Sequence, residues 1–121
     1  MKKILVVDDK LSISKLIVQF LSKSFDVELR EDGLQAMAWL QNGNIPDLIL
    51  TDLQMPNMDG LELIQGVKES GYFKDIPVIV LSSRESSNDR VECLKLGADD
   101  YIMKPFNPEE LLIRIERVLT R

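Results

Sequence analysis

The sequence predicts a single α/β domain built on a doubly wound parallel sheet, and three observations support this fold class. The chain has 121 residues, the size of one domain with a substantial core. Five short apolar runs alternate with stretches in which apolar residues have helical spacing,. Residues 78–81 (VIVL) are apolar throughout, as expected of a parallel strand buried on both faces, and right-handed crossovers then place helices on both sides of the sheet.

Five strands and five helices are expected, in strict alternation. The predicted strands cover residues 4–7, 26–29, 48–50, 78–81 and 101–103. In open parallel sheets, ligands gather outside the carboxyl ends of the strands. The residues that follow each strand are therefore the first candidates for a functional site.

The first helix is predicted from a run of apolar residues at steps of three and four. These are Ile13, Leu16, Ile17, Phe20 and Leu21. Such a stripe lies on one side of a helix with 3.6 residues per turn. We expect all of it to pack on the sheet.

The next three helices have simpler signals. Met37 and Trp39 lie in the second and are expected to pack rather than to contact a cofactor,. Asp59 is expected to cap the third,. The fourth covers about 87–96 and stops at Gly97, the residue type that most easily follows a helix in the left-handed conformation,.

The last helix is the best delimited. Asn107 can cap it, Pro108 suits its first turn and Glu110 completes a capping pattern,. Its predicted buried face consists of Leu111, Leu112, Ile115, Val118 and Leu119.

Composition excludes several classes of function. The net charge of −5 argues against a surface that holds a nucleic acid directly,. With no histidine and one cysteine, Cys93, the chain cannot form a histidine-based triad, a zinc site or an internal disulfide,. The first apolar run is too short for a signal peptide or a membrane span. We expect a cytoplasmic protein with one domain, residues 1–121.

The strand ends carry three carboxylates, a hydroxyl and an ammonium that would converge. They lie in Asp8-Asp9, Thr51-Asp52, Ser82-Ser83 and Lys104-Pro105. Each alone is more simply a cap, a turn residue or a surface charge. Together they favour a functional site, because neighbouring strands would bring them into one crevice.

The predicted chemistry of that crevice is phosphoryl transfer. Clustered carboxylates repel unless they are protonated or a cation bridges them, and oxygen ligands without histidine or thiolate suit Mg²⁺. Residues 7–10 (VDDK) occupy the turn where a nucleotide-binding fold would place glycines,. An anion could still bind beside the metal, held by the lysine ammonium and the serine hydroxyl.

These residues resemble the receiver domains of two-component response regulators over essentially the whole chain. The motifs are 4–9 (ILVVDD), 46–52 (PDLILTD), 55–60 (MPNMDG), 77–82 (PVIVLS) and 97–106 (GADDYIMKPF). The resemblance implies a CheY-like, flavodoxin-like (βα)5 sandwich with strand order 2-1-3-4-5. It further implies that Asp52 accepts a phosphoryl group from a phosphohistidine of a sensor kinase or phosphotransfer protein.

The resemblance also implies roles for the other residues of the crevice. Asp9, Asp52 and the backbone carbonyl of Gln54 would ligate Mg²⁺, and Asp8 would act mainly through a metal-bound water. Lys104 would pair with the phosphoryl oxygens.

Two residues are implied as the switch. Ser82 would move toward the phosphoryl group, and Tyr101 would turn inward behind it. Tyr101 could equally be a core aromatic with its hydroxyl at the surface. Pro105 is a cis proline in the family and would orient Lys104.

Three residues depart from the family pattern. Gln54 and Ser83 would flank the phosphoryl group and leave its lifetime undetermined. Lys10 stands where an acidic residue often follows the aspartate pair. We hypothesise that its charge weakens Mg²⁺ affinity slightly.

The output is predicted from a charged face similar to that of receivers joined to winged-helix transcription factors. Arg90 with Glu110, and Asp100 with Arg114, would pair there in a phosphorylation-dependent homodimer. The alternative is a solvated face with scattered charges. Both a longer regulator, whose output domain would follow, and a stand-alone receiver acting on an effector protein fit the length.

Two other classes of protein fit these residues less well. A haloacid-dehalogenase-type phosphotransferase also uses an aspartate with Mg²⁺, but its Asp-x-Asp spacing after the first strand is absent from residues 8–10 (DDK). A receiver-like interaction module that has lost phosphorylation is disfavoured because Asp9, Asp52, Ser82 and Lys104 are all present.

Overall fold

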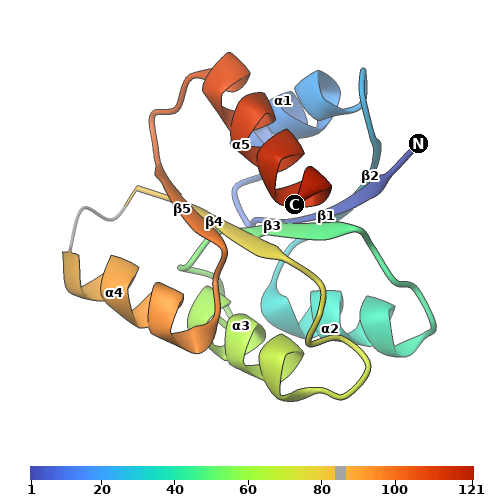
Figure 1. Cartoon of the computed structure of the whole chain (residues 1–121), viewed down its shortest axis with the longest axis vertical. Coiled ribbons are helices and arrows are strands. Elements are labelled where there is room, and N and C mark those ends of the chain that lie inside the picture. The colour runs from blue at the N-terminus through green and yellow to red at the C-terminus, as the bar shows by residue number, and fades with distance from the viewer. Residues whose placement is uncertain (84–86) are drawn as a thin grey trace.

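A computed structural model of the chain describes residues 1–83 and 87–121 (Figure 1). Its strands are β1 (Lys3–Val7), β2 (Asp26–Arg30), β3 (Leu48–Thr51), β4 (Val78–Ser82) and β5 (Asp100–Met103). Its helices are α1 (Leu11–Leu21), α2 (Gly33–Gln41), α3 (Gly60–Glu69), α4 (Ser87–Leu96) and α5 (Pro108–Thr120). Strands and helices alternate along the chain as predicted.

The five strands form one parallel sheet in the order β2-β1-β3-β4-β5. Helices α1 and α5 cover one face, and α2, α3 and α4 cover the other (Figure 1). This arrangement confirms the doubly wound α/β sandwich and the strand order that the resemblance implied.

The core has two halves, one on each face of the sheet. In β1, Ile4 and Val6 join the apolar cluster on the side of α1 and α5, whereas Leu5 and Val7 join the cluster on the side of α2, α3 and α4. All four side chains are buried. A strand covered on both faces must be apolar at every position, which is why β1, β3 and β4 read as continuous apolar runs.

The packing predicted for α1 is wrong for two residues. Ile13 and Leu16 are 40% and 67% exposed, and the buried line of the helix is Ser14, Ile17 and Leu21. Because α5 shares this face of the sheet, α1 covers only part of it and buries a narrow strip. Ser14 fits that strip because its hydroxyl donates to the carbonyl of Leu11 at 3.2 Å.

The predicted caps Asn107 and Asp59 and the stop at Gly97 are confirmed, whereas the Glu110 side chain accepts from Arg114, and its part in a capping pattern stays a prediction. Asn107 caps α5 by accepting from the backbone N–H of Glu109 at 2.8 Å and of Glu110 at 3.3 Å. Asp59 and Glu62 form a reciprocal capping box at the start of α3. Gly97, which follows α4, has φ of +113°.

The packing residues lie as predicted. Trp39 is buried, and Met37 is half-buried against the cluster on the side of α2, α3 and α4. Across the described residues, none of the helices has the length and apolar character needed to span a bilayer.

Candidate functional site

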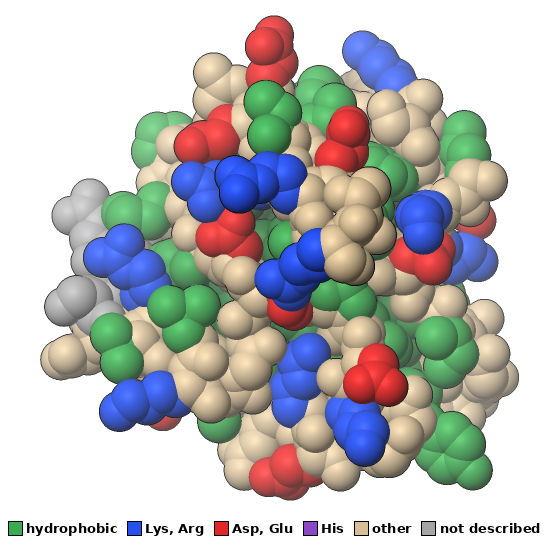
Figure 2. All heavy atoms as spheres, in the orientation of Figure 1, with side chains coloured by type: hydrophobic (Ala, Val, Ile, Leu, Met, Phe, Trp, Pro, Cys, Tyr) green, Lys and Arg blue, Asp and Glu red, His purple; other side chains and the backbone are tan. Residues whose placement is uncertain are grey.

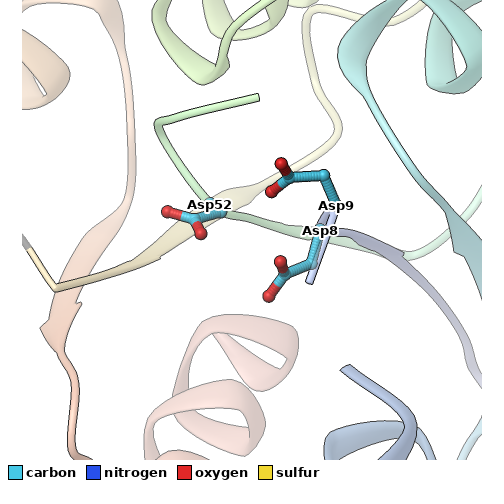
Figure 3. A group of neighbouring side chains, drawn as sticks. All are labelled: Asp8, Asp9 and Asp52. Carbon is cyan, nitrogen blue, oxygen red and sulfur yellow. The ribbon is translucent and has the colours of Figure 1, made fainter. Parts of the chain in front are cut away.

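The acidic residues meet at the carboxyl edge of the sheet. Val7 of β1 pairs with Thr51 of β3, so the residues that follow these two strands come side by side. The backbone N–H of Asp52 donates to the carbonyl of Val7 at 3.0 Å. Figure 3 shows Asp8 and Asp9 at the end of β1, with their side chains extending toward the end of β3, where Asp52 lies.

Asp8, Asp9 and Asp52 form a carboxylate cluster. Each offers an oxygen, and these three oxygens lie within 4.8 Å of one another. Asp8 and Asp52 are only 3% and 5% exposed, whereas Asp9 is exposed. The cluster therefore has two buried carboxylates and one that faces water.

Lys104 reaches the cluster from the end of β5. Its Nζ lies 3.2 Å from Asp8 Oδ2 and 3.4 Å from Asp52 Oδ2. The lysine side chain is 11% exposed. The ammonium is thus held between the two buried carboxylates, and the Lys104–Pro105 peptide bond that follows is cis, as the resemblance implied.

The second oxygen of each buried carboxylate is fixed by the backbone. Asp8 Oδ1 accepts from the N–H of Lys10 at 2.9 Å, and Asp52 Oδ1 accepts from the N–H of Leu53 at 2.6 Å. Both side chains are therefore held by hydrogen bonds on one oxygen while the other faces Lys104. Carboxylates held in this way are already oriented, so their side chains need not move when a cation binds.

The donor set suits a hard divalent cation. Three carboxylates against one ammonium leave a formal excess of two negative charges in the cluster. Oxygen ligands without histidine or thiolate are those that Mg²⁺ prefers. Gln54, Asp9 and Asp59 line a shallow hollow of about 500 Å³ beside the cluster, so the residue whose carbonyl is the predicted ligand lies in the same region.

Gly60 allows the loop after β3 to fold back on the cluster. Its N–H donates to the carbonyl of Leu53 at 2.8 Å. A Cβ at this position would lie 2.3 Å from the carbonyl oxygen of Asp52, so a side chain is excluded. The absent side chain lets the start of α3 approach the backbone of the candidate acceptor.

The two predicted switch residues lie on neighbouring strands. Ser82 ends β4 and is buried. Tyr101 in β5 pairs in register with Val80 and is half-buried against the apolar cluster on the side of α2, α3 and α4. Their positions allow the predicted switch, and the movement itself stays a prediction.

Two ion pairs are predicted on the charged face. One of them, Arg114 with Asp100, forms between residues of the same chain. Arg114 Nη1 lies 2.9 Å from Asp100 Oδ2, and Arg114 Nη2 lies 3.3 Å from Glu110 Oε1. The hydrogen bond to Asp100 and its charge raise the pKa of the Arg114 guanidinium above its ordinary value,. Arg90 is exposed on α4, and its pairing with Glu110 stays a prediction.

Basic and acidic side chains are intermixed on the face of the molecule that includes the end of α5 (Figure 2).

Lys10, one of the three residues that depart from the family pattern, is exposed and lines a hollow with Lys104 and Phe106. Its effect on metal affinity stays a prediction.

One buried carboxylate near this edge escaped the sequence analysis. Asp32 is 3% exposed and caps α2, and it also accepts a hydrogen bond from Asn57 in the loop after β3. The available signal was an aspartate followed by glycine before a helical stretch, which indicates only a cap. The contact with Asn57 spans 25 residues of sequence and has no local signature.

Comparisons with known proteins agree with these observations. Residues 4–116 match the family described as the response regulator receiver domain. Response regulator MprA of Mycobacterium sp. (strain KMS) is 42% identical over 98% of this chain and 51% of its own length. Regulatory protein VanRc of Enterococcus gallinarum is 38% identical over 99% of this chain and 51% of its own. The chain thus spans about half the length of these curated relatives.

A solved structure is also similar over nearly the full length. The chemotaxis response regulator CheY4 of Vibrio cholerae has a TM-score of 0.89 and 35% identity, and the match covers 98% of each chain. The family predicted from the sequence motifs is confirmed.

Proposed function

Because the chain belongs to the response regulator receiver domain family, we propose that it is a phosphorylation-dependent signalling switch whose phosphoacceptor is Asp52. The observation that carries this proposal is the convergence of Asp8, Asp9 and Asp52 with the ammonium of Lys104 at one edge of the sheet. No single residue of this set would support it.

In the proposed reaction, a carboxylate oxygen of Asp52 attacks the phosphorus of a phosphohistidine on a sensor kinase or phosphotransfer protein. An O–P bond forms as the N–P bond breaks, and the imidazole nitrogen leaves with the electron pair of that bond. The chain itself has no histidine, so the donor nitrogen comes from the partner.

Attack requires that two anions approach each other, and the residues of the cluster reduce this repulsion. Lys104, already beside Asp52, is placed to hold the oxygens of the incoming phosphoryl group. Asp9, Asp52 and the Gln54 carbonyl would hold Mg²⁺, with Asp8 acting through water. When bound, the ion supplies positive charge that further offsets the repulsion.

The response to phosphorylation is proposed to begin at Ser82 and Tyr101. The new acyl phosphate adds roughly two negative charges beside the end of β4. The Ser82 hydroxyl would bond to it, and Tyr101 would turn inward. The surface formed by α4, β5 and α5, which carries Arg90, Asp100, Glu110 and Arg114, would change shape as a result.

The output is proposed to be transcriptional, through an output domain joined to this one and a phosphorylation-dependent homodimer. Its support is the similarity to MprA and VanRc, of which this chain spans 51%. This domain would work in the cytoplasm without touching nucleic acid or membrane. The second candidate is a stand-alone receiver that acts on an effector protein, as the coverage of 98% of CheY4 allows.

The test is phosphorylation by a small-molecule phosphodonor with Mg²⁺. We expect the parent chain to gain the mass of one phosphoryl group and Asp52→Asn to gain none. Asp75→Asn, which removes an exposed carboxylate, is the matched control and should be labelled like the parent. Labelling that survives in Asp52→Asn would reassign the nucleophile.

A further inference from the structure

A buried carboxylate outside the acidic cluster joins two loops at the same edge of the sheet. Asp32 ends the β2–α2 connection and is 3% exposed. Its Oδ1 accepts from the backbone N–H of Gln35 at 2.8 Å, which caps α2. Its Oδ2 accepts from Asn57 Nδ2 at 2.8 Å, and Asn57 belongs to the β3–α3 loop.

The backbone joins the same two loops next to this contact. The N–H of Gly33 donates to the carbonyl of Met58 at 3.0 Å. A Cβ on Gly33 would lie 2.7 Å from that oxygen, so the two loops are in direct contact. We call the four residues Asp32, Gly33, Asn57 and Met58 the loop clip.

The conformation of Asn57 depends on its place in this clip. Its φ is +67°, a left-handed value that asparagine tolerates better than other residues with a side chain. Its side-chain amide points to Asp32 rather than to its own backbone. The hydrogen bond therefore favours one conformation at the middle of the β3–α3 loop.

The cap of α2 does not by itself explain an aspartate at position 32. Serine caps helices about as well as aspartate does, but only a forked side chain can cap with one atom and accept a second hydrogen bond with another. A buried carboxylate is also unfavourable unless both oxygens are satisfied. Asn57 satisfies the second oxygen, so the pairing of the two residues accounts for both.

The loop that the clip holds leads from Asp52 to α3. It contains Gln54, which lines the hollow beside Asp9. Its two ends are fixed by β3 and by the hydrogen bond from Gly60 to Leu53, and the clip holds its middle. A shift of the loop would move the Gln54 carbonyl relative to the carboxylates.

We infer that Asp32 is a positioning residue for the Mg²⁺ site and acts through Asn57 on the β3–α3 loop. This inference rests on the proposed function, since it assumes that the acidic cluster and Gln54 bind the metal. Outer residues that orient metal ligands commonly affect affinity on the order of tenfold or more. A residue that only capped α2 would affect stability alone.

The experiment titrates the full chain with Mg²⁺ alone and follows backbone amide chemical shifts. Asp32→Ser keeps a capping oxygen and removes the link, whereas Asn57→Gly keeps the left-handed backbone and removes the link. The double variant tests whether both act through one contact. Asn44→Ala is the matched control, because it removes an amide hydrogen bond, to the carbonyl of Trp39, near the other end of α2.

We expect each single variant to raise the Kd for Mg²⁺ on the order of tenfold and the double variant to be no weaker than the singles. In the metal-free chain, hydrogen exchange of the Gly33 amide should become faster in Asp32→Ser and in Asn57→Gly. Asp32→Asn should keep the Kd of the parent. Its amide oxygen can cap α2, and its amide nitrogen can donate to the side-chain oxygen of a flipped Asn57. Asn44→Ala should lower stability without changing the Kd.

An unchanged Kd in both Asp32→Ser and Asn57→Gly would overturn the inference, and so would fully additive effects in the double variant. If Asp32→Ser does not fold, Asn57→Gly alone decides the outcome. Phosphorylation of the parent at Asp52 is measured in parallel, so that the proposed function is tested independently of this inference. A parent chain that binds no Mg²⁺ would overturn the inference together with the metal site.

Discussion

Lys104 Nζ lies 3.4 Å from Asp52 Oδ2, although 52 residues of sequence separate the two. The same nitrogen lies 3.2 Å from Asp8 Oδ2. One ammonium thus serves two buried carboxylates before any phosphoryl group arrives. It stabilises the metal-free pocket, and in the proposed reaction it turns toward the incoming anion.

Replacement of Lys104 by methionine should affect both roles. Lys104→Met keeps most of the side-chain length and leaves Asp8 and Asp52 buried without their cation. We expect the free energy of unfolding to fall by about 3 kcal/mol, the lower end for breaking a buried pair. The rate of phosphorylation should fall on the order of a hundredfold.

Urea unfolding and single-turnover labelling measure these two effects. Lys74→Met, at an exposed position, is the matched control and should leave both nearly unchanged. Wild-type rates in Lys104→Met would show that the ammonium does not assist transfer.

Mg²⁺ should stabilise the folded chain by mass action. At a free concentration of ten times its Kd, the free energy of unfolding should rise by about 1.4 kcal/mol. Asp9→Asn should lose most of this gain, and it should fold normally because Asp9 is exposed. Thermal unfolding with and without MgCl2, against sodium chloride of equal ionic strength, separates binding from screening. Equal stabilisation by both salts would argue against a specific site.

Gly60→Ala should distort the loop after β3. The added Cβ would lie 2.3 Å from the carbonyl oxygen of Asp52, so the start of α3 must move. We expect a loss of about 2 kcal/mol in unfolding free energy together with weaker Mg²⁺ binding. Gly71→Ala adds the same methyl group in open space and should stay within about 0.5 kcal/mol of the parent. Equal unfolding free energies for Gly60→Ala and Gly71→Ala would mean that the β3–α3 loop can accommodate the added methyl group.

Dimerisation on activation should depend on Arg114. Analytical ultracentrifugation with beryllium trifluoride and Mg²⁺ should show a dimer for the parent and a monomer for Arg114→Gln. Lys23→Gln, exposed after α1, serves as the control and should dimerise. A dimer that persists in Arg114→Gln would place the interface elsewhere.

The pH dependence of the contact between Arg114 and Asp100 within the chain follows from the raised pKa of Arg114. A cation with a folded-state pKa above its unfolded value contributes its full stabilisation below the unfolded value and loses it only as the pH rises through the folded value. For an arginine, that range is strongly alkaline. Around neutral pH, we therefore expect Arg114 to contribute no pH dependence to folding or dimerisation.

Tyr101 should change rotamer on activation. Structures of the chain with and without beryllium trifluoride would show the ring turned inward in the first and half-exposed in the second. The physical reason is that movement of Ser82 toward the phosphoryl group opens space beside β5. Identical rotamers in both would remove Tyr101 from the switch and leave it as a packing residue.

The sequence predicted those parts of the site that follow from regular structure. Asp8, Asp52 and Lys104 each follow a strand directly, and parallel strands bring their carboxyl ends to one edge, so the strand pattern predicts that edge. The strand order that makes them neighbours was implied by the family resemblance. Leu16 was mispredicted because helical spacing identifies an apolar stripe but not the width that neighbours cover. Asp32 was missed because its second partner, Asn57, lies in a different loop, and such contacts leave no periodic trace.

The order of the strands along the chain has a consequence for biosynthesis. A chain emerging from the ribosome already carries all three acidic residues when Asp52 leaves the exit tunnel, but the cation that lies between two of them follows β5, 52 residues later. The pocket cannot be completed by an N-terminal fragment. A nascent or truncated polypeptide that ends before Lys104 therefore has its acidic residues but lacks the ammonium that contacts Asp8 and Asp52.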